Sequence, residues 1–520
     1  MNKDLQTVLN YHQTTKHSQQ RYARSLGYMD WSAQPDPFRD YKGARKIKLT
    51  HSSQNATPPY SMLDEDLPSA PLVKESLSQL LEYAMGLAAW KISGDSSWAV
   101  RCNASSGNLH PTESFVILPP IFDEQNAKSG VYHYAPKNHE LEVLAEFETP
   151  FWDELQSGSF LVGLSSVSWR EVWKYGERAF RYTQLDAGHA WQAFVVSAKM
   201  LGWRVTRLDS VSHADATKLL GLSQENRFFE SEVADMLFVV SPNEVEPSLS
   251  LENLIENAPL VYEGIANKLS PSMYEWEIIP TIEEATSVNQ IAQKKVPRSK
   301  VKRSATGDSR EIVLNRRSVH VMEKEKSLIT KEQFHATLSS VAGSLDGKEN
   351  SAHLVLFVNR VEEYAPGLYA LVRNMNVIDQ LKEQTNPAFE WKETDLENLY
   401  FLKEQNFTGL SKSISCGQDI AGDGAFSLGM LCDYTAQLQK YGAHRYKELY
   451  WECGAIGQQL YLEATSMGLS GTGIGCFLDD MTHEVLDLKS NRFQVLYHFT
   501  IGRGHVDSRI QTRKPYEERE

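Results

Sequence analysis

The stretch KYGERAFRYTQLDAGHAWQAFVVSAKMLG (residues 174–202) decides the fold of this chain, because it occurs twice. Residues 440–468 read KYGAHRYKELYWECGAIGQQLYLEATSMG and align with it without a gap. The coinciding positions are Lys174/Lys440, Tyr175/Tyr441, Gly176/Gly442, Gly188/Gly454, Gln192/Gln458, Ala198/Ala464 and Gly202/Gly468. The same register extends from Phe160/Phe426 to Leu222/Leu488. A repeat whose period is a whole domain indicates a duplicated domain and not a solenoid.

Each half of the chain shows the same predicted order of helices and strands. In the first half we expect a helix over residues 75–87, strands over 113–121, 130–136, 141–147 and 160–164, one long helix over 174–202 and a closing strand over 235–242. The matching segments of the second half are 331–343, 353–361, 366–372, 440–468 and 498–504. Apolar residues at helical spacing mark the helices, and short β-branched apolar runs mark the strands. Interleaved helices and strands predict two α+β domains.

The length of 520 residues is too great for one ordinary core and suits two or three domains. We expect an N-terminal arm over residues 1–59, a first domain over 60–245, an interdomain connection over 246–311, a second domain over 312–510 and a tail over 511–520. The connection carries a basic run, KKVPRSKVKR (294–303), among Ser, Thr and Gly, which is typical of a solvated linker.

Composition argues against several classes of function. The formal net charge of −14 disfavours a nucleic-acid backbone as the main partner, because phosphate binding needs a positive face. The five cysteines are odd in number and show no CxxC spacing, so we expect reduced thiols and neither a disulfide framework nor a zinc site. The chain shows no signal sequence and no apolar run long enough to span a membrane, so we expect a soluble, cytoplasmic protein without a membrane partner.

Two stretches break the repeat, in opposite halves of the chain. RCNASSGNLHPTES (101–114) offers hydroxyls, a carboxamide and a glycine that lets backbone approach a planar ligand, although an ordinary turn explains it equally well. NRRSVHV (315–321) offers two guanidinium groups and a hydroxyl, which would suit a phosphate at a helix start, although a solvated arginine pair is the simpler alternative. The corresponding segments, DGKENSAHL and ARKIKLTHSSQN, have lost these clusters.

Together with the repeat, these motifs resemble the nitroreductase superfamily of flavin enzymes. The similarity is greatest to its SagB/ThcOx-type branch, which includes azoline dehydrogenases. It covers nearly the whole chain and rests on YHQTTKHSQQRYARSLGYMDW, RCNASSGNLHPTE, WKYGERAFRYTQLDAGHA and RRSVHV. The resemblance implies α+β domains, each a mixed or antiparallel sheet flanked by helices, which pair around FMN. In this tandem-duplicated chain it implies an internal pseudo-dimer, and it leaves further association of chains open.

The resemblance also assigns cofactor-binding residues. The family's phosphate cluster, Arg-(Arg/His)-Ser-x-(Lys/Arg), falls on Arg316, Arg317, Ser318 and His320. Its Pro-Ser-Ser-x-Asn loop, which faces the flavin ring, falls on Ser105, Ser106 and Asn108. A segment near the isoalloxazine falls on residues 474–477, with Gly475 and Cys476 at its centre, and late basic residues fall near Arg503 or Arg509. Ala104 and His320 depart from the family pattern, and the histidine would make phosphate binding weaker and pH-dependent.

The family's site architecture explains why the two halves have kept different motifs. A homodimer has two equivalent sites, each built from both subunits, so a fused duplicate can keep one site while the other degenerates. The second half keeps the phosphate cluster and the first half keeps the ring-facing loop. We therefore expect one FMN per chain.

Substrate-side residues follow from the azoline dehydrogenases, whose Lys-Tyr pair resembles Lys174-Tyr175 or Lys440-Tyr441. Either group near flavin N5 could take a proton while hydride leaves a neighbouring carbon, whereas the alternative is packing at a helix start with a solvated amine. The first copy is favoured because its surroundings match the branch better. His110 and Arg101 flank the loop and are candidates to face the small-molecule substrate.

The sequence therefore predicts an FMN-dependent oxidoreductase that transfers hydride through flavin N5. Two kinds of substrate compete: nitro, quinone or other small aromatic compounds reduced with NADH or NADPH as donor, or an azoline-type heterocycle that is oxidised. The alternative from a different class is a flavin-binding protein or scaffold that has lost turnover. No metal is expected.

Overall fold

The computed structural model describes residues 2–51, 56–122, 128–301, 303 and 305–516. Small parts of the expected arm, first domain, basic run and tail lie outside these ranges. The described chain forms two compact units. Unit 1 contains residues 1–23, 293–307 and 315–508, and unit 2 contains residues 24–292, 308–314 and 509–520. The segments expected to form an arm and a tail therefore belong to the units themselves.

Unit 2 is built on a seven-stranded antiparallel sheet with the order β2-β7-β6-β5-β8-β10-β9. Its strands are β2 (Arg45–Lys48), β5 (Thr112–Leu118), β6 (Ser129–Ala135), β7 (Glu140–Phe147), β8 (Phe160–Ser166), β9 (Arg204–Arg207) and β10 (Val233–Ser241). The main helices are α2 (Lys74–Met85), α3 (Ser168–Tyr175), α4 (Ala179–Met200) and α5 (His213–Leu219). A second sheet joins β19 (Gln511–Arg513), β3 (Leu87–Ser93) and β4 (Ser96–Arg101), and β1 (Tyr41–Lys42) pairs with β11 (Ile265–Ala266).

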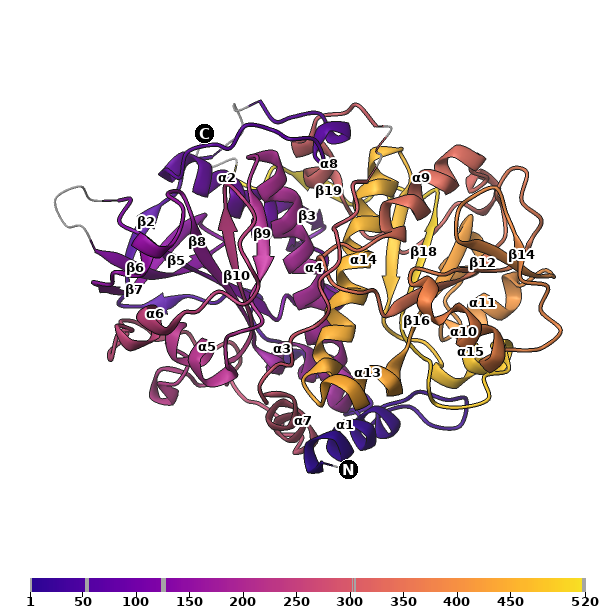
Figure 1. Cartoon of the computed structure of the whole chain (residues 1–520), viewed down its shortest axis with the longest axis horizontal. Coiled ribbons are helices and arrows are strands. Elements are labelled where there is room, and N and C mark those ends of the chain that lie inside the picture. The colour runs from indigo at the N-terminus through magenta and orange to yellow at the C-terminus, as the bar shows by residue number, and fades with distance from the viewer. Residues whose placement is uncertain (1, 52–55, 123–127, 302, 304, 517–520) are drawn as a thin grey trace. The chain divides into compact units, whose positions relative to one another are not determined.

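Unit 1 repeats this sheet with the order β14-β15-β13-β12-β16-β18-β17. Its strands are β12 (Ala352–Val358), β13 (Gly367–Leu371), β14 (Lys392–Glu393), β15 (Leu399–Glu404), β16 (Phe426–Cys432), β17 (Ser470–Ile474) and β18 (Gln494–Gly502). Its helices are α1 (Lys3–Thr14), α9 (Lys331–Ala342), α10 (Ile378–Gln384), α11 (Thr408–Ile414), α12 (Ile420–Asp423), α13 (Tyr434–Tyr441), α14 (Arg445–Ser466) and α15 (Asp479–Leu486). Figure 1 draws the unit 2 strands β2 to β9 in indigo to magenta and the unit 1 strands β16 and β18 in orange to yellow.

The repeat seen in the sequence is a repeat of structure. Strand β8 matches β16, helix α3 matches α13, and α4 matches α14, each residue for residue in the gapless register. Helix α4 packs against α2 and strand β8 in unit 2, and α14 packs against α9 and strand β17 in unit 1. Every residue of α4 except Lys199 is buried. The duplicated α+β fold is therefore confirmed.

The predicted single long helix over residues 174–202 is wrong, because the chain breaks at Gly176. Helix α3 ends at Tyr175, Gly176 has φ of +54°, and α4 begins at Ala179. A Cβ on Gly176 would lie 2.3 Å from the Arg24 carbonyl oxygen, so only glycine fits this turn. Lys174 and Tyr175 thus end a helix, whereas the sequence placed them at a helix start.

The segment expected to be an interdomain linker is largely folded. It forms α6 (Glu252–Glu256), β11 and α7 (Ile278–Thr286), and Leu254 and Tyr262 lie in the core of unit 2. In unit 1 the basic run packs on the loop before β12, where the Val296 and Ser299 N–H groups donate to the Gly347 and Ser344 carbonyls at 2.8 and 3.0 Å. The segment folds because it contains apolar residues that reach a core, such as Leu254 and Tyr262. The many charged residues around them made the segment resemble a solvated linker in the sequence.

Helix α8 (Ser309–Asn315) follows the basic run. None of the helices in the described ranges is both long enough and apolar enough to cross a membrane.

Candidate active site

The loop predicted to face a flavin ring (residues 105–108) and the first Lys-Tyr pair meet at Gly107 in unit 2. The loop joins β4 to β5 and turns through a short 3-10 segment, Ser106–Asn108, in which Gly107 has φ of +59°. A Cβ built on Gly107 would lie 2.9 Å from the Tyr175 hydroxyl and 3.2 Å from Lys174 Nζ. The glycine therefore leaves the room that both polar groups occupy. The two motifs, which lie more than sixty residues apart in the sequence, form one cluster.

Asp186 on helix α4 holds this loop in place. Its carboxylate accepts hydrogen bonds from the Ser106 N–H at 3.0 Å and from Ser106 Oγ at 2.9 Å, and Ser105 also hydrogen-bonds to it. Burial raises the pKa of Asp186 from its ordinary value of 3.8 to about 7, although these hydrogen bonds oppose the rise. The sequence prediction missed Asp186. An acid at this position in both copies of the repeat, Asp186 and Glu452, was the available signal.

Glu171 adds a second buried acid beneath the Lys-Tyr pair. Its side chain is fully buried on α3, and neither carboxylate oxygen has a hydrogen-bond partner among the described residues. Burial raises the pKa of Glu171 well above its ordinary value, and the negative charge of Asp186 adds to the rise, while Lys174 and Arg170 oppose it. The raised pKa favours the neutral form of Glu171, which could donate a hydrogen bond. The sequence prediction missed this residue, too, and its position one helical turn before Lys174 was the only signal.

The loop side chains are largely engaged within the loop. Asn108 donates to the Ala99 carbonyl at 2.9 Å and contacts His110 Nε2 at 3.0 Å. The His110 N–H donates to Ser105 Oγ at 2.8 Å. Asn108 and His110 have φ of +58° and +51°, which non-glycine residues rarely adopt. The exposed edge of the loop is therefore mostly backbone at Gly107.

Arg101 is held inside unit 2. Its guanidinium donates to the Pro37 carbonyl, lies 5.3 Å over the Phe38 ring and is almost fully buried. Burial lowers the pKa of Arg101 to about 10. These contacts join the loop to the segment before β1, and substrate contact by Arg101 and His110 stays a prediction.

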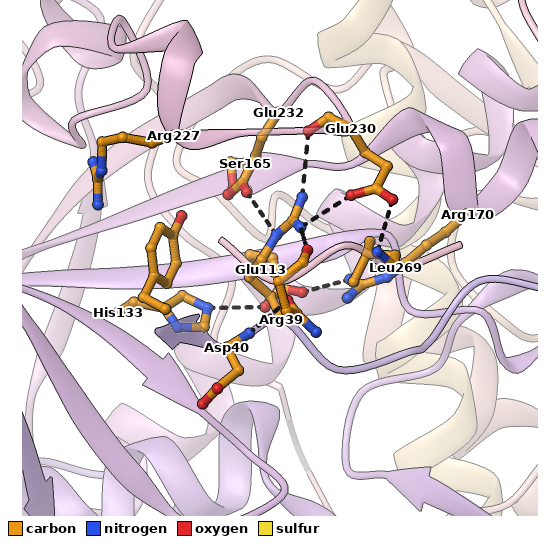
Figure 2. A network of polar contacts seen from close by, with 12 residues as sticks. Arg39, Asp40, Glu113, His133, Ser165, Arg170, Arg227, Glu230, Glu232 and Leu269 are labelled. Carbon is orange, nitrogen blue, oxygen red and sulfur yellow. Dashed lines mark hydrogen bonds and ion pairs between the residues drawn. The ribbon is translucent and has the colours of Figure 1, made fainter. Parts of the chain in front are cut away.

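A buried charge network, shown in Figure 2, contacts the same loop through Arg170. Arg170 on α3 donates to the Glu113 carboxylate and, at 2.7 Å, to the His110 carbonyl. Burial by itself would raise the pKa of Glu113, but the charges of Arg170 and His133 outweigh it and lower that pKa to about 2. Burial would lower the pKa of His133, but hydrogen bonds with Glu113 and Glu142 raise it to about 9. The network therefore fixes the loop to helix α3.

The remainder of the network lies around Arg39. Its guanidinium is 3.4 Å from Glu230 and 3.3 Å from Glu232, and all three side chains are fully buried. Figure 2 shows both acids beside Arg39. Glu230 also accepts from the Leu269 N–H at 2.7 Å. These contacts attach two connecting segments of unit 2, residues 36–40 and 267–270, to its main sheet.

The predicted phosphate cluster lies in unit 1, and its expected position at a helix start is wrong. Arg316 follows the end of α8, and Ser318 forms a parallel bridge with Gly471 of β17. The extended backbone is held there because Thr472 Oγ1 accepts from the Val319 N–H at 3.0 Å. No helix N-terminus therefore contributes N–H groups at these residues.

The side chains of the cluster differ in exposure. Arg316 is buried with its guanidinium 5.1 Å over the Tyr461 ring, and Ser318 Oγ lies 2.7 Å from the Tyr461 hydroxyl. Arg317 is half-buried and donates to the Arg316 carbonyl, while His320 is exposed. Phosphate binding by these four residues stays a prediction.

The other predicted cofactor residues of unit 1 follow or precede segments that bridge to the one carrying Ser318: Ser318 pairs with Gly471 of β17, and Met322 pairs with Gly504. Gly475 and Cys476 follow β17 and are half-buried in unit 1, and Arg503 is exposed there and donates to the Gly468 carbonyl at 3.2 Å. Arg509 belongs to unit 2 and is exposed. The second Lys-Tyr copy ends α13, with Lys440 Nζ 4.7 Å from the centre of the Tyr441 ring.

Comparison with known proteins agrees with this architecture. The family model described as "Nitroreductase family" matches residues 67–229 and 368–503. A crystal structure described as a nitroreductase from Anabaena variabilis has a TM-score of 0.71 at 21% identity, covering 96% of this chain and 99% of that chain. A nitroreductase structure with bound FMN from Bacteroides fragilis has a TM-score of 0.22 at 16% identity, covering 38% of this chain and 90% of that one.

One curated relative matches over a short segment. A protein from Methanocaldococcus jannaschii that carries the name nitroreductase is 33% identical over 57 residues. The match covers 11% of this chain and 29% of the relative, so the chain spans less than a third of that relative's length.

Proposed function

The chain belongs to the nitroreductase family, whose members are generally flavin-dependent oxidoreductases, and from this premise we propose that it binds FMN and transfers hydride at the Gly107 cluster. The observation that carries the proposal is the convergence of Lys174 Nζ and the Tyr175 hydroxyl on Gly107. A planar ring system can approach a loop whose tip has no side chain, and two proton-carrying groups stand beside that tip.

The residues present fit a flavin at this place. Gly107 leaves backbone open to a ring, and Glu171 is a buried acid whose oxygens have no partner among the described residues. Flavin, when bound, supplies the hydride-accepting and hydride-donating centre. By the resemblance of the sequence motifs alone, Arg316, Arg317, Ser318 and His320 are the candidates to bind a flavin phosphate. Because the ring-facing loop occurs only in the first half and the Arg-Arg-Ser cluster only in the second, we propose one FMN per chain.

The chain's own residues would transfer the proton that accompanies hydride transfer. Tyr175 and Lys174 would exchange a proton with the substrate atom next to the reacting carbon. Lys174 is exposed and so can exchange that proton with solvent. Asp186 and Glu171 would support them. Asp186 would position the loop through Ser106, and the raised pKa of Glu171 favours its neutral form, which would limit the negative charge in the buried site.

We propose the azoline-dehydrogenase direction as the finer assignment, because azoline oxidation needs a base to take a proton from carbon and the Lys-Tyr pair beside Gly107 could supply one. Reduction of quinones or nitro compounds with NADH or NADPH is the second candidate. The resemblance of the sequence motifs, over nearly all the chain, to the SagB/ThcOx-type branch supports the first.

Spectroscopy of the purified full chain tests the proposal. We expect a flavin absorbance band with one FMN per chain. An azoline-containing peptide added anaerobically should bleach the band in the wild type but not in Lys174→Ala, whereas Lys440→Ala serves as the matched control. Bleaching by NADH or NADPH alone would favour a reductase. A bound flavin that none of these compounds reduces would favour a protein without turnover, and absence of flavin binding would overturn the proposal.

A further inference from the structure

Two thiols and an imidazole lie together in unit 1, in residues that the proposed reaction does not use as acids or bases. Cys476 Sγ is 2.7 Å from Cys416 Sγ and 3.8 Å from His17 Nδ1. The three atoms all lie within 4.8 Å of one another. Both cysteines are half-buried, so solvent reaches the cluster. The three residues are far apart in the sequence, which is why cysteine spacing did not predict a site.

The two cysteine-bearing loops are tied to each other. Cys416 follows α11 and has φ of +55°, and Gly417 continues the left-handed turn with φ of +77°. Gln418 Nε2 donates to the Ser415 carbonyl at 2.9 Å and to the Cys476 carbonyl at 3.2 Å. The Leu478 N–H donates to the Ile414 carbonyl at 2.7 Å. The thiols are therefore held together by backbone, and not only by contact with each other.

His17 is fixed to the same region by an exchange of hydrogen bonds. Its N–H donates to Asp479 Oδ2 at 2.8 Å, and the Asp479 N–H donates to the His17 carbonyl at 3.1 Å. The neighbouring Lys16 pairs with Asp480 at 2.7 Å. Asp479 begins α15 directly after the Cys476 loop, so the histidine and that cysteine share one support.

Other groups in the described chain lack this combination. Cys432 and Cys453 also approach each other, with sulfurs 3.6 Å apart, but both are fully buried and no described histidine joins them as a third ligand. His51, Glu82 and His139 form a second cluster, but both ring nitrogens of His139 are engaged, by the Tyr134 hydroxyl at 2.8 Å and the Thr50 carbonyl at 3.1 Å. The Cys2His cluster therefore offers the best-suited set of ligand atoms.

We propose that His17, Cys416 and Cys476 bind one thiophilic divalent metal ion of the zinc class. Zinc favours thiolate and imidazole ligands at about 2.3 and 2.0–2.1 Å in tetrahedral geometry. Such bond lengths separate two sulfurs by about 3.7 Å, so binding would move the thiols apart by about 1 Å, which small side-chain rotations allow. Binding releases two thiol protons, and the fourth position stays open to water or to the nearby Tyr22 hydroxyl.

Cobalt(II) is the probe for this site. The full chain is reduced, freed of metal under argon and titrated with Co2+. We expect one equivalent to produce a thiolate-to-cobalt charge-transfer band and tetrahedral d–d bands, which Zn2+ then displaces. The double variant Cys416→Ser/Cys476→Ser should lose the charge-transfer band. His17→Gln should weaken cobalt affinity by roughly tenfold or more. His51→Gln and Cys453→Ala are the matched controls and should leave the spectrum unchanged.

The proposal is overturned by the absence of a charge-transfer band in the reduced wild type, by an unchanged band in the double cysteine variant, or by loss of the band in His51→Gln. A Cys416–Cys476 disulfide that forms equally fast with and without stoichiometric Zn2+ would also overturn it, and would assign the pair to thiol oxidation. Circular dichroism confirms that each variant is folded. The flavin content and flavin reduction of the same samples are measured separately, so failure here is distinct from failure of the proposed function.

Discussion

The two copies of the repeated helix pair, α3–α4 in unit 2 and α13–α14 in unit 1, differ most in the side chains around one buried acid. At matching positions Asp186 on α4 and Glu452 on α14 each accept backbone N–H groups from the loop before a central strand, Ser106 in unit 2 and Ser351 in unit 1. Glu452 also pairs with Arg373 at 2.6 Å, whereas the described contacts of Asp186 are hydrogen bonds from Ser105 and Ser106. The same framework therefore supports a compensated structural acid in one half and a protonatable acid beside the Lys-Tyr pair in the other.

The largest expected difference between the copies is in turnover. Lys174→Ala or Tyr175→Phe should lower the rate of flavin-linked substrate oxidation by about 10²–10⁴-fold, the usual range for a positioned acid or base. Lys440→Ala and Tyr441→Phe should stay within about twofold, because no ring-facing loop accompanies them. Steady-state kinetics of the four variants measures the contrast, and equal losses in both pairs would contradict it.

The second difference is in the turn after each Lys-Tyr pair. A Cβ on Gly176 would strike the Arg24 carbonyl at 2.3 Å, whereas a Cβ on Gly442 meets nothing within 4 Å. Both glycines have positive φ, so Gly442→Ala should cost about 1–2 kcal/mol of stability from backbone strain alone. Gly176→Ala should cost about 3 kcal/mol or more. Chemical denaturation measures the loss of stability in each variant. A larger loss in Gly442→Ala than in Gly176→Ala would contradict the prediction and would show that the turn at Gly176 can rearrange to accept a Cβ.

The third difference separates Glu452 from Asp186 in their effect on stability. Glu452→Gln should leave the guanidinium of Arg373 without its charge partner and destabilise unit 1 by about 2 kcal/mol, below the range for a fully buried pair because Glu452 is partly exposed. Asp186→Asn removes no cation's partner and should be neutral or stabilising at pH 8. Equal destabilisation by both substitutions in urea would contradict the comparison.

The smallest expected effect is the pH dependence carried by Asp186. Its folded pKa of about 7 lies above its ordinary value of 3.8, so the folded state binds the proton more tightly than the unfolded state. The stabilising contribution is complete below about pH 4 and is lost as pH rises through about 7. The unfolding free energy of Asp186→Asn, measured relative to that of the wild type, should therefore increase between pH 5 and pH 8. We expect an increase of about 1–2 kcal/mol. A flat difference would show that Asp186 is ionised throughout.

The fold was predictable because its evidence is local and repeated. A gapless register over some sixty residues aligned the two copies, and turn-bounded apolar runs identified β5, β6, β7, β8 and β10 in unit 2 and β12, β13 and β18 in unit 1. The errors arose where tertiary contact decides the conformation. Gly176 ends a helix because of the Arg24 carbonyl, and residues 246–292 fold because Leu254 and Tyr262 find a core.

The site was predictable only as separate motifs. Lys174, Tyr175 and the loop at Gly107 were each found, but their meeting depends on how α3 ends and how the Arg170–Glu113 contact attaches the loop to that helix. Glu171 and Asp186 were missed because an acid in a sequence is ordinarily a solvated acid. Only burial makes these two unusual.

By itself, then, the sequence determined the duplication, the α+β plan, the family and the motifs that carry chemistry, because periodicity and repeated spacing are properties of the chain alone. Tertiary structure alone decided which of these motifs share a site, which acids are buried with raised pKa values, and that His17, Cys416 and Cys476 come together. Those outcomes depend on distances through space and on exclusion of water, and neither is written in the order of the residues.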